Sequence, residues 1–415
     1  AAENPNVKAR LTEDIDMSGY SEGYVPPQMF TGEFDGQGHV ISNFVIDSSD
    51  SYQGLIGVIA DGAVIKNVIL DKSCSIRAGS YAGVIGSTSG SGKIYITNVG
   101  FEGEVGVTVR NAAGIIGVDM GGSMDMIITN CWVTGTIVDG VESGAICGYS
   151  NATSIVTNCW STCQMPESAI YSSDSFTRGT AKVVNCYEAD IEGVDPSKQQ
   201  PIKPLAEDRR AYPVTLEEVA NGALCYNLNG KQFREPVWYQ RLEEDEHPYP
   251  FAENHGVVIY AAGKYFSMLS EADVAAVAAA VQGEAENAFV DVIATQSLID
   301  EFKATVEAIG NVTTVPALAD ALDAIAAAEE AVKQNAAVYQ AYIDKCTDVK
   351  AYLDENHDFA GELREGLEAY LNDNDEPTDE NPLGTYAYIL EEHTATADEI
   401  KAETERVAKW LSDAI

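Results

Sequence analysis

The sequence predicts a mainly β protein with an α-helical part, in which a right-handed parallel β-solenoid is followed by a helical bundle. Three observations lead to this prediction. Short motifs recur about every 30 residues, 29 of the 35 glycines lie before residue 261, and an Ala-rich stretch with a seven-residue apolar repeat follows. We therefore expect a solenoid over residues 1–190, a closing β-rich segment over 191–264 and an acidic helical bundle over 265–415. The main boundary should lie near Lys264–Ser270.

Two motifs define the repeat of the first part. Gly-Leu-Ile-Gly at 54–57 recurs as Gly-Val-Ile-Gly at 83–86 and Gly-Ile-Ile-Gly at 114–117, with a degenerate copy at 144–148. Each copy is followed by β-branched residues around an asparagine. One such unit cannot bury its apolar face alone, so about six stacked coils are the natural solution. Right-handedness follows from the usual hand of parallel crossovers. A β-sandwich is the alternative, but sandwich strands need not repeat in sequence.

The asparagines of the second motif align the coils with one another. Asparagine tolerates left-handed backbone geometry, and its amide can bond to the next coil. The residue after each asparagine is small and apolar and therefore belongs inside, and period-2 alternation sends the next residue to the opposite face. The asparagines are Asn67, Asn98, Asn130, Asn158 and Asn185. The column expected inside is Val68, Val99, Cys131, Cys159 and Cys186, and the column expected outside is Ile69, Gly100, Trp132, Trp160 and Tyr187.

The chain has eight cysteines, three of which belong to the inward column. Cysteine acts there as a small apolar filler, so we expect thiols packed in the core. A disulfide is the alternative, for example between Cys159 and Cys163. A metal role is also open, although no histidine stands near that pair to complete a zinc site.

The last part of the chain carries the signals of helices. Ser270 to Asp273 resembles a capping box, Pro316 suits the first turn of a long helix, and Thr396 to Glu399 opens a final one. A seven-residue spacing predicts a core-facing seam. Its members are Leu318, Ile325, Val332, Tyr339, Cys346 and Leu353. We expect an antiparallel bundle of three to five helices, with an acidic, proline-containing loop over 374–382.

Charge and hydropathy exclude several classes of partner. The chain has 65 acidic and 25 basic residues, a formal net charge of −40, which argues against nucleic acids and anionic membranes. No apolar run approaches the ~20 residues of a membrane span. We find no P-loop, dinucleotide fingerprint, nucleophile elbow or zinc-ligand cluster, so no cofactor and no metal are predicted. The oligomeric state is left open.

The repeated Gly-x-Ile-Gly block with its asparagine strand resembles the GLUG repeat of bacterial surface proteins. Residues 11–19 and 30–41 resemble the opening coil of those domains, and 222–230, 238–240 and 245–248 resemble the segment that closes them. The resemblance covers about residues 8–262 and implies an adhesin-like protein at the bacterial cell surface or outside the cell.

GLUG repeats also occur in immunoglobulin A1 protease-like proteins, whose peptidase part carries a His-Glu-x-x-His motif. None of the five histidines here, at 39, 247, 255, 357 and 393, stands in that motif.

The outward aromatic column is the first candidate site. Trp132, Trp160 and Tyr187 would stack about 5 Å apart, and exposed rings at that spacing suit sugar rings or a flat protein surface. The alternative is that the closing segment or the helical part packs over them.

A carboxylate cluster is the second candidate site. Asp71 and Glu102 fall at equivalent coil positions and Glu104 lies two residues further on, unless the register slips at Gly103. Parallel β-helices can host sugar-cleaving enzymes with such clusters, although scattered surface acids are the simpler interpretation.

The sequence therefore predicts a non-enzymatic, adhesin-like surface protein whose rigid solenoid presents a binding surface to host or dietary glycans or to surface proteins. Two alternatives stay open. One is a polysaccharide-degrading lyase or hydrolase, and the other is a structural spacer within a larger surface protein.

Overall fold

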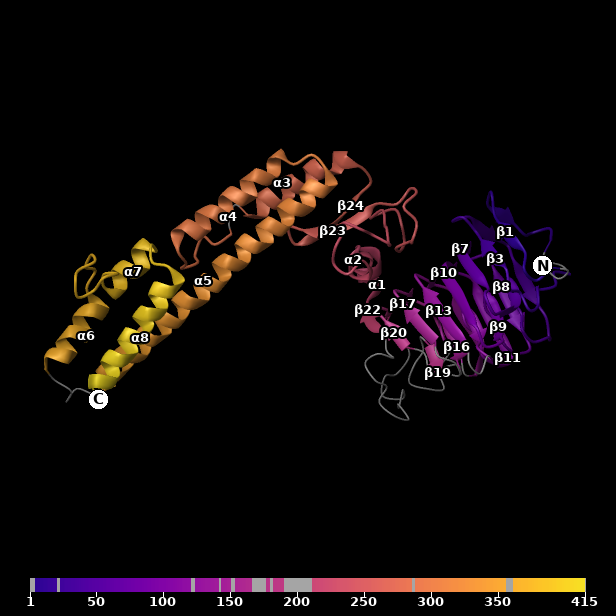
Figure 1. Ribbon diagram of the computed structural model, residues 1–415, viewed down its shortest axis with the longest axis horizontal. Helices are drawn as coiled ribbons and strands as arrows, with labels where there is room; N and C mark the ends of the chain where they lie inside the picture. The colour runs from indigo at the N-terminus through magenta and orange to yellow at the C-terminus, as the bar shows by residue number, and fades with distance from the viewer. Residues whose placement is uncertain are drawn as a thin grey trace. The chain divides into compact units, whose positions relative to one another are not determined.

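The computed structural model describes residues 4–20, 23–120, 124–141, 143–150, 154–165, 177–179, 182–189, 211–285, 288–355 and 361–414. The chain divides into two compact units, Ala1–Ile259 and Tyr260–Ile415. The first contains a parallel β-solenoid of about six turns and the second is helical (Figure 1). The predicted fold class is confirmed. None of the helices in the described ranges combines the length and the apolar character needed to cross a membrane.

Three parallel sheets form the walls of the solenoid. The first contains β1 (Lys8–Arg10), β2 (Ile15–Asp16), β3 (Glu33–Asp35), β4 (Val40–Ser42), β7 (Val64–Leu70), β10 (Lys93–Phe101), β13 (Asp125–Thr129), β14 (Trp132–Val133), β17 (Ser154–Thr157), β18 (Trp160–Ser161), β20 (Lys182–Val184), β21 (Tyr187–Ala189) and β22 (Tyr212–Val214). The second contains β6 (Ile56–Ala60), β9 (Ile85–Ser89), β12 (Ile116–Val118), β16 (Cys147–Ser150) and β19 (Thr177–Gly179). The third contains β5 (Val45–Asp47), β8 (Ser75–Ala78), β11 (Glu104–Arg110) and β15 (Thr136–Val141).

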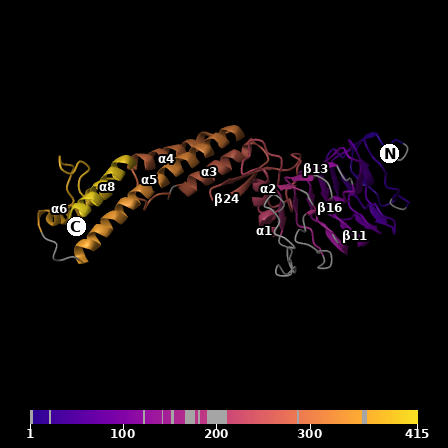
Figure 2. The same ribbon diagram turned by 60° about the horizontal axis from the view of Figure 1, so that its bottom comes forward.

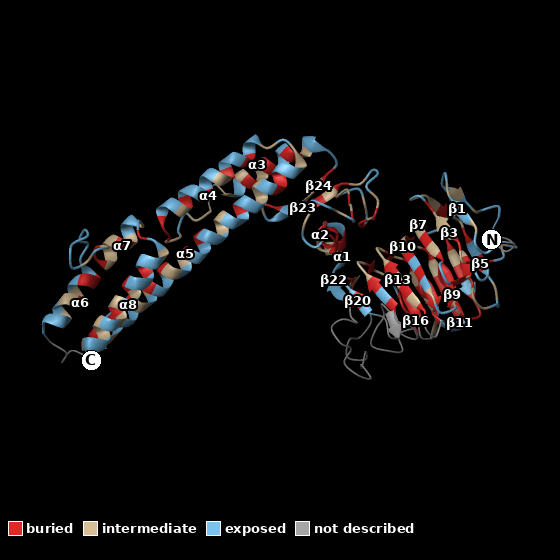
Figure 3. Cartoon of the chain, in the orientation of Figure 1, coloured by how far each residue is buried: buried red, intermediate tan, exposed pale blue. Residues whose placement is uncertain are grey.

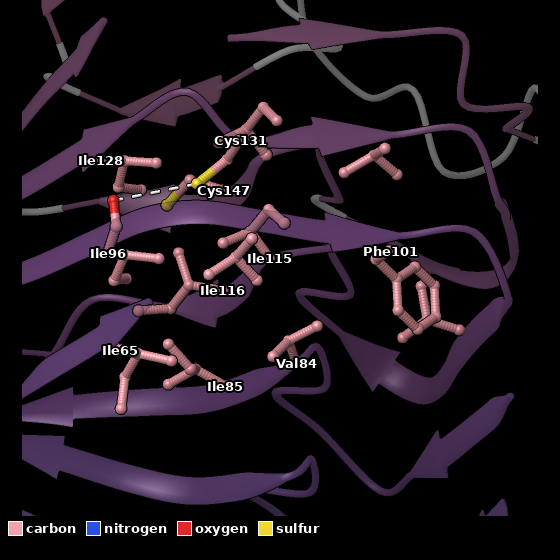
Figure 4. Packing of buried hydrophobic residues seen from close by; sticks show 14 of the residues in the cluster. Ile65, Val84, Ile85, Ile96, Phe101, Ile115, Ile116, Ile128, Cys131 and Cys147 are labelled. Carbon is pink, nitrogen blue, oxygen red and sulfur yellow. Dashed lines mark hydrogen bonds between the residues drawn. The ribbon is translucent and has the colours of Figure 1, made fainter. Parts of the chain in front are cut away.

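The repeat motifs set the register of these sheets. Ile96 of β10 pairs with Ile65 of β7 and with Ile128 of β13, so equivalent residues of successive coils stack in columns. Figure 4 shows these isoleucines one above another inside the solenoid. The pleat turns alternate residues inward, which Figure 3 shows as bands of buried and more exposed residues along the strands.

A ladder of asparagine side chains runs along the solenoid. Each asparagine has a left-handed φ between 50° and 56°, as the turn requires. The side-chain amide of Asn98 donates to Asn67 Oδ1 (2.8 Å), that of Asn130 donates to Asn98 (3.0 Å), and Asn67 donates to Asp35 Oδ1 (2.9 Å). Asn158 and Asn185 continue the ladder. The predicted role of these asparagines is confirmed.

The inward column is fully buried, as predicted. Cys131 N donates to Cys159 Sγ (3.2 Å) and Cys159 N donates to Cys186 Sγ (3.3 Å), so the three thiols stack along the core. Figure 4 shows Cys131 among the stacked isoleucines, within 3.8 Å of the Ile96 carbonyl oxygen. All eight cysteines of the chain are buried free thiols, and none forms a disulfide.

The closing segment differs from its prediction. Residues 191–210 lie outside the described part, and residues 211–256 contain β22 and two short helices, α1 (Leu216–Ala220) and α2 (Ala223–Leu228), followed by irregular loops. The expectation of a β-rich segment over 191–264 is therefore wrong for these residues. The reason is local, because Thr215 and Glu218 form a capping box that starts a helix immediately after β22.

A two-stranded sheet lies where the first unit ends and the second begins along the chain. It consists of β23 (Val257–Ala261) and β24 (Lys264–Met268).

Six α-helices make up the described part of the second unit, rather than the three to five expected. The number is higher because the predicted acidic loop over 374–382 divides one stretch of chain into two short helices, α6 (Glu362–Asn372) and α7 (Tyr386–Glu392). The helices are α3 (Val274–Ala285), α4 (Gln296–Ala308), α5 (Val315–Glu355), α6 (Glu362–Asn372), α7 (Tyr386–Glu392) and α8 (Ala397–Ala414), with 3₁₀ turns at Glu271–Asp273 and Ile309–Asn311.

The long helix α5 organises this unit. All six residues of the predicted seam are buried, and Pro316 stands in the first turn. The helices α3 and α4 lie alongside α5 in both views (Figures 1 and 2), and α8 packs on another stretch of it. The capping box predicted at Ser270 is present, and the helix predicted to open at Thr396 begins with a second one, formed by Thr396 and Glu399.

Candidate functional site

The predicted aromatic column forms in register but is not an open surface. Gly100 pairs with Trp132, Trp132 with Trp160, and Trp160 with Tyr187. Both tryptophans have no exposed surface. The alternative interpretation therefore holds for them, because the closing segment packs over both rings.

Four side chains of the closing segment form this cover. The ring centroids of Trp238, Tyr249 and Phe251 lie 6.1, 5.8 and 6.1 Å from that of Trp132, each approaching edge to face. The imidazole of His247 lies 5.1 Å from the Trp160 ring. Such edge-to-face pairs add to the free energy gained by burying the rings. The two tryptophans therefore belong to a second, smaller core outside the solenoid wall.

Tyr187 is the partly exposed end of the column. Its ring centroid lies 5.6 Å from that of Tyr212, and its hydroxyl donates to Asn185 Oδ1 (3.1 Å). Partial burial raises the pKa of its phenol. Tyr187 alone does not provide the stacked aromatic platform that the sequence suggested.

A cavity of about 690 Å³ lies beside the covered tryptophans. One wall comes from three successive coils of the solenoid, between Gln37 and Glu102, and the other comes from residues 249–255 of the closing segment. We call it the Asp71–Glu102 cavity after two of its lining residues. Its volume lies within the usual range of pockets for small ligands.

Backbone hydrogen bonds hold the closing wall in place. Tyr239 and Tyr249 exchange two backbone hydrogen bonds of 2.8 Å, and Gln240 N donates to Gly256 O (2.8 Å). The Phe251 ring lies beside Gly38, where a methyl group on Cα would sit 3.5 Å from the ring, an ordinary van der Waals distance. Gly38 has a φ of +84°, and this left-handed turn is what favours glycine there.

Asp71 and Glu102 are neighbours on adjacent coils, as the sequence predicted. Their preceding residues, Leu70 and Phe101, are paired in register, and Glu102 N donates to Leu70 O (2.9 Å). Paired positions on adjacent coils are separated by about 4.8 Å. Both carboxylates line the cavity. The structure therefore brings this predicted pair together.

One oxygen of each carboxylate is held by the protein. Asp71 Oδ1 accepts from Ser73 N (2.9 Å) and from the Ser73 hydroxyl. Glu102 Oε1 accepts from Trp132 Nε1 (3.3 Å) and lies 3.4 Å from His247 Nε2. These contacts orient each carboxylate and leave its second oxygen without a hydrogen bond to the described residues.

Two histidines at the cavity are also oriented by carboxylates. His39 Nδ1 lies 3.1 Å from Asp14 Oδ1, and His255 Nδ1 lies 2.7 Å from Asp245 Oδ2. The Tyr249 ring lies between the imidazoles of His247 and His255, at centroid distances of 4.4 and 4.6 Å. Burial, with the nearby carboxylates of Glu102, Asp245 and Glu246, raises the pKa of the Tyr249 phenol. The phenol therefore stays protonated at neutral pH.

Glu104 does not join the other two carboxylates. It begins β11 on a different sheet, where it forms an ion pair with Arg77 (3.1 Å). The expected cluster of three is therefore wrong as a spatial group. The reason is the turn at Gly103, where a methyl group on Cα would lie 2.2 Å from the Cys74 carbonyl oxygen. The chain changes sheets at this point.

The described lining of the cavity holds three carboxylates and two histidines, but no lysine or arginine. The carboxylates are those of Asp71, Glu102 and Glu253. Within the described residues, no group of three or more histidine, cysteine, aspartate or glutamate side chains is arranged to hold a metal ion. The arrangement is suited to a ligand rich in hydrogen-bond donors.

Sequence reasoning missed the residues of the closing wall. Tyr249, Phe251 and His255 belong to no repeat, so the alignment of coils could not place them. One feature of the sequence could have indicated them. Two outward tryptophans are too apolar to stay exposed, and the aromatic-rich segment that follows the repeats is the natural candidate to cover them.

Comparisons with known proteins give limited similarity. The sequence matches no family model. A stretch of 110 residues is 34% identical to halomucin of Haloquadratum walsbyi (strain DSM 16790 / HBSQ001), covering 23% of this chain and 1% of halomucin.

Among solved structures, a candidate immunoglobulin A1 protease from Bacteroides ovatus aligns with a TM-score of 0.37 and 18% identity, over 59% of this chain and 85% of that one. These similarities do not assign the chain to a family, and the GLUG resemblance stays a prediction.

Proposed function

We propose that this protein is a non-enzymatic, extracellular binding protein whose solenoid carries a glycan site in the Asp71–Glu102 cavity. One observation carries the proposal. Oriented carboxylates, ladder amides and aromatic rings from separate parts of the chain converge on a single cavity.

The lining suits the chemistry of a sugar ring. Sugar hydroxyl groups donate to carboxylates and amides, and the C–H faces of the ring pack on aromatic side chains. The solenoid wall supplies Asp71, Glu102 and the amides of Asn67 and Asn98, and the closing wall supplies Tyr249 and Phe251. The solenoid wall is rigid, because each coil is bonded to its neighbours, so a ligand would meet a preorganised site.

The extracellular location rests on the resemblance to GLUG-repeat surface proteins. The strong negative charge is compatible with it, because a net charge far from zero keeps a protein soluble and separate from other acidic surfaces. Within this proposal the solenoid is a scaffold, and the binding chemistry is confined to the cavity and its rim.

A glycan panel tests the proposal. The purified chain is screened against neutral, amino and acidic oligosaccharides, and every hit is titrated by calorimetry with two variants. Asp71→Ala removes a carboxylate of the cavity, and Glu104→Ala removes the nearby carboxylate that lies on another sheet. We expect Asp71→Ala to weaken binding about tenfold or more and Glu104→Ala to leave it unchanged. Absence of any hit, or equal binding by both variants, would refute the proposal and favour a structural spacer.

A second candidate function is cleavage of a glycosidic bond. The observation that favours it is the pairing of Asp71 and Glu102 across one coil step of about 4.8 Å, close to the carboxylate separation of retaining glycosidases. Incubation with a polysaccharide panel, followed by a reducing-end assay, distinguishes the two functions. A binding protein releases no reducing ends, whereas an enzyme releases ends that disappear in both Asp71→Asn and Glu102→Gln.

A further inference from the structure

We infer that the Asp71–Glu102 cavity selects glycans that carry a protonated amine and rejects glycans that carry carboxylates. This inference rests on the proposed glycan-binding function and specifies its ligand class. It depends on which atoms of the cavity are already bonded and on which charges the lining provides.

The free atoms of the two carboxylates are the first observation. Asp71 uses Oδ1 for Ser73, and Glu102 uses Oε1 for Trp132 and His247. Asp71 Oδ2 and Glu102 Oε2 make no hydrogen bond with the described residues. They are acceptors on neighbouring coils, and an ammonium group brings three donors on one atom. An ammonium held between the two coils would offer a donor to each oxygen, whereas an amide such as an N-acetyl group brings a single N–H.

In their neutral form, the two histidines of the lining each add one acceptor to the cavity. A carboxylate only accepts hydrogen bonds, so the Nδ1 atoms of His39 and His255 must carry the protons that they share with Asp14 and Asp245. In the neutral imidazole the other nitrogen, Nε2, is then an acceptor. Neither Nε2 has a hydrogen-bond partner among the described residues. The cavity thus presents acceptors from both of its walls.

The charge of the lining sets the direction of selectivity. Three carboxylates line the cavity, and the described lining includes no lysine or arginine to pair with an anionic group. A uronic or sialic acid would bring a fourth negative charge into the partly enclosed site, which opposes binding. An amino sugar brings the opposite charge. The Phe251 ring, against Gly38 and edge to face with Trp132, supplies an apolar surface beside these acceptors.

The overall acidity of the chain must be separated from the effect of the site. A net charge of −40 attracts any oligocation, so binding of an amino sugar alone proves little. Isosteric variants solve this problem. Asp71→Asn keeps an acceptor for Ser73, and Glu102→Gln keeps an acceptor for Trp132, while each removes one charge and replaces the free oxygen with an amide nitrogen. Glu104→Gln removes the same charge outside the cavity and is the matched control.

The experiment is calorimetric titration at physiological salt with three trisaccharides: glucosamine, N-acetylglucosamine and galacturonate. The pH is chosen so that the amine is protonated. We expect the glucosamine trisaccharide to bind about tenfold or more tightly than its acetylated form, and galacturonate not to bind. Asp71→Asn and Glu102→Gln should each remove this preference, and Glu104→Gln should retain it. Circular dichroism and thermal unfolding verify that each variant is folded.

The possible outcomes separate the two proposals. Equal or tighter binding of the acetylated or acidic sugar, with sensitivity to the cavity variants, overturns the inference and leaves the glycan site in place. If all three variants keep the preference for glucosamine, the net negative charge of the chain attracts the sugar, and the inference is also overturned. No binding of any sugar, here or on the glycan panel, overturns both proposals.

Discussion

Trp132 Nε1 donates a hydrogen bond to Glu102 Oε1 across 3.3 Å, and this contact joins the covered aromatic column to the Asp71–Glu102 cavity. The indole reaches Glu102 because it lies over Gly100, which has no side chain in the way. His247 approaches the same carboxylate oxygen from the closing segment (3.4 Å). The aromatic column that the sequence suggested as a binding surface is therefore covered at Trp132, and there it orients a carboxylate of the cavity through a hydrogen bond.

Gly100 is the first position at which this arrangement can be tested. A Cβ atom there would lie 2.1 Å from Trp132 Cζ2, so Gly100→Ala forces the indole away from Glu102. We expect the free energy of unfolding to fall by about 1–3 kcal/mol, the usual cost of overpacking. Chemical denaturation of the purified variant measures it. Gly263→Ala is the comparison, since nothing lies within 4 Å of its added methyl, although its positive φ carries a cost of its own. An unchanged stability of Gly100→Ala would contradict the described position of the indole.

The asparagine ladder gives a second prediction, in which two substitutions separate two effects. Asn130→Gly keeps the left-handed backbone but leaves the amide groups of Asn98 and Asn158 without their partner, at a cost of about 1–3 kcal/mol. Asn130→Ala adds the cost of a left-handed φ for a residue with a Cβ, about 1–2 kcal/mol more. Urea denaturation should therefore rank the wild type above Gly and Gly above Ala. If Ala proves as stable as Gly, the left-handed geometry contributes nothing.

Buried thiols give a third prediction. Burial raises the pKa of Cys74 and of Cys346 to about 12, and it raises the pKa of Cys159 as well. The reactive thiolate is therefore scarce at about pH 8 in the folded protein, and the reagent also lacks access. A colorimetric thiol assay should detect almost no thiol in the native state and all eight in denaturant. Rapid reaction of one native cysteine would locate an opening of the core.

The carboxylates Glu33 and Asp35, at the start of the asparagine ladder, give a prediction about the stability of the fold at low pH. Hydrogen bonds and ion pairs from Lys66 and Lys8 lower the pKa of Glu33. Burial alone would raise the pKa of Asp35, but hydrogen bonds from Asn67 and Gln37, with the Lys66 contact, lower it overall. Both carboxylates therefore stabilise the fold above their unfolded pKa of about 4, and this contribution is lost as the pH falls through the lower folded values.

Lys66→Met tests this sign. The variant should lose less stability than the wild type when the pH falls below about 4, because its carboxylates have less charge stabilisation to lose. Thermal unfolding as a function of pH measures the difference. Lys93→Met is the control, since Lys93 and Asp125 are 4.0 Å apart and largely exposed. Parallel pH profiles for the wild type and Lys66→Met would contradict the prediction.

An ion pair between a buried carboxylate and a partly exposed arginine gives a prediction for the helical unit. Glu403 is almost fully buried on α8, where it accepts from Arg406 Nε (2.9 Å) and from the Tyr370 hydroxyl (2.5 Å). Arg406→Met leaves this carboxylate without its cation, so we expect a loss of about 3–5 kcal/mol. Lys401→Met removes an exposed pair with Asp398 on the same helix and should cost less than about 1 kcal/mol. Similar denaturation midpoints for the two variants would contradict the described burial of Glu403.

The periodic parts of the fold were predictable because each coil repeats the same local problem. Val68, Val99 and Cys131 occupy one buried column, and the turn asparagines occupy one left-handed position, so a single alignment located both. The seam of α5 was equally accessible, since a seven-residue spacing fixes one face of a helix. The pair Asp71 and Glu102 followed from the same alignment.

The cavity was not predictable, because it depends on a segment outside the repeat. Nothing in the spacing of Tyr249 or Phe251 indicates which coil they cover, and that choice decides whether Trp132 is exposed. Glu104 was misplaced for a related reason, since a single turn residue, Gly103, transfers it to another sheet. The repeat period determines which residues stack in columns, whereas the position of the closing segment and of the turns depends on individual contacts.

The most direct test of the central claim compares an aromatic residue of the cavity with one of the predicted column. Phe251→Ala removes a ring of the cavity wall, and Tyr187→Ala removes the partly exposed ring at the end of the column. Both variants are titrated with the tightest ligand of the glycan panel after their folding has been verified. If the cavity is the site, Phe251→Ala loses most of the affinity and Tyr187→Ala keeps it. Loss with Tyr187→Ala and retention with Phe251→Ala would contradict the account and return the site to the aromatic column.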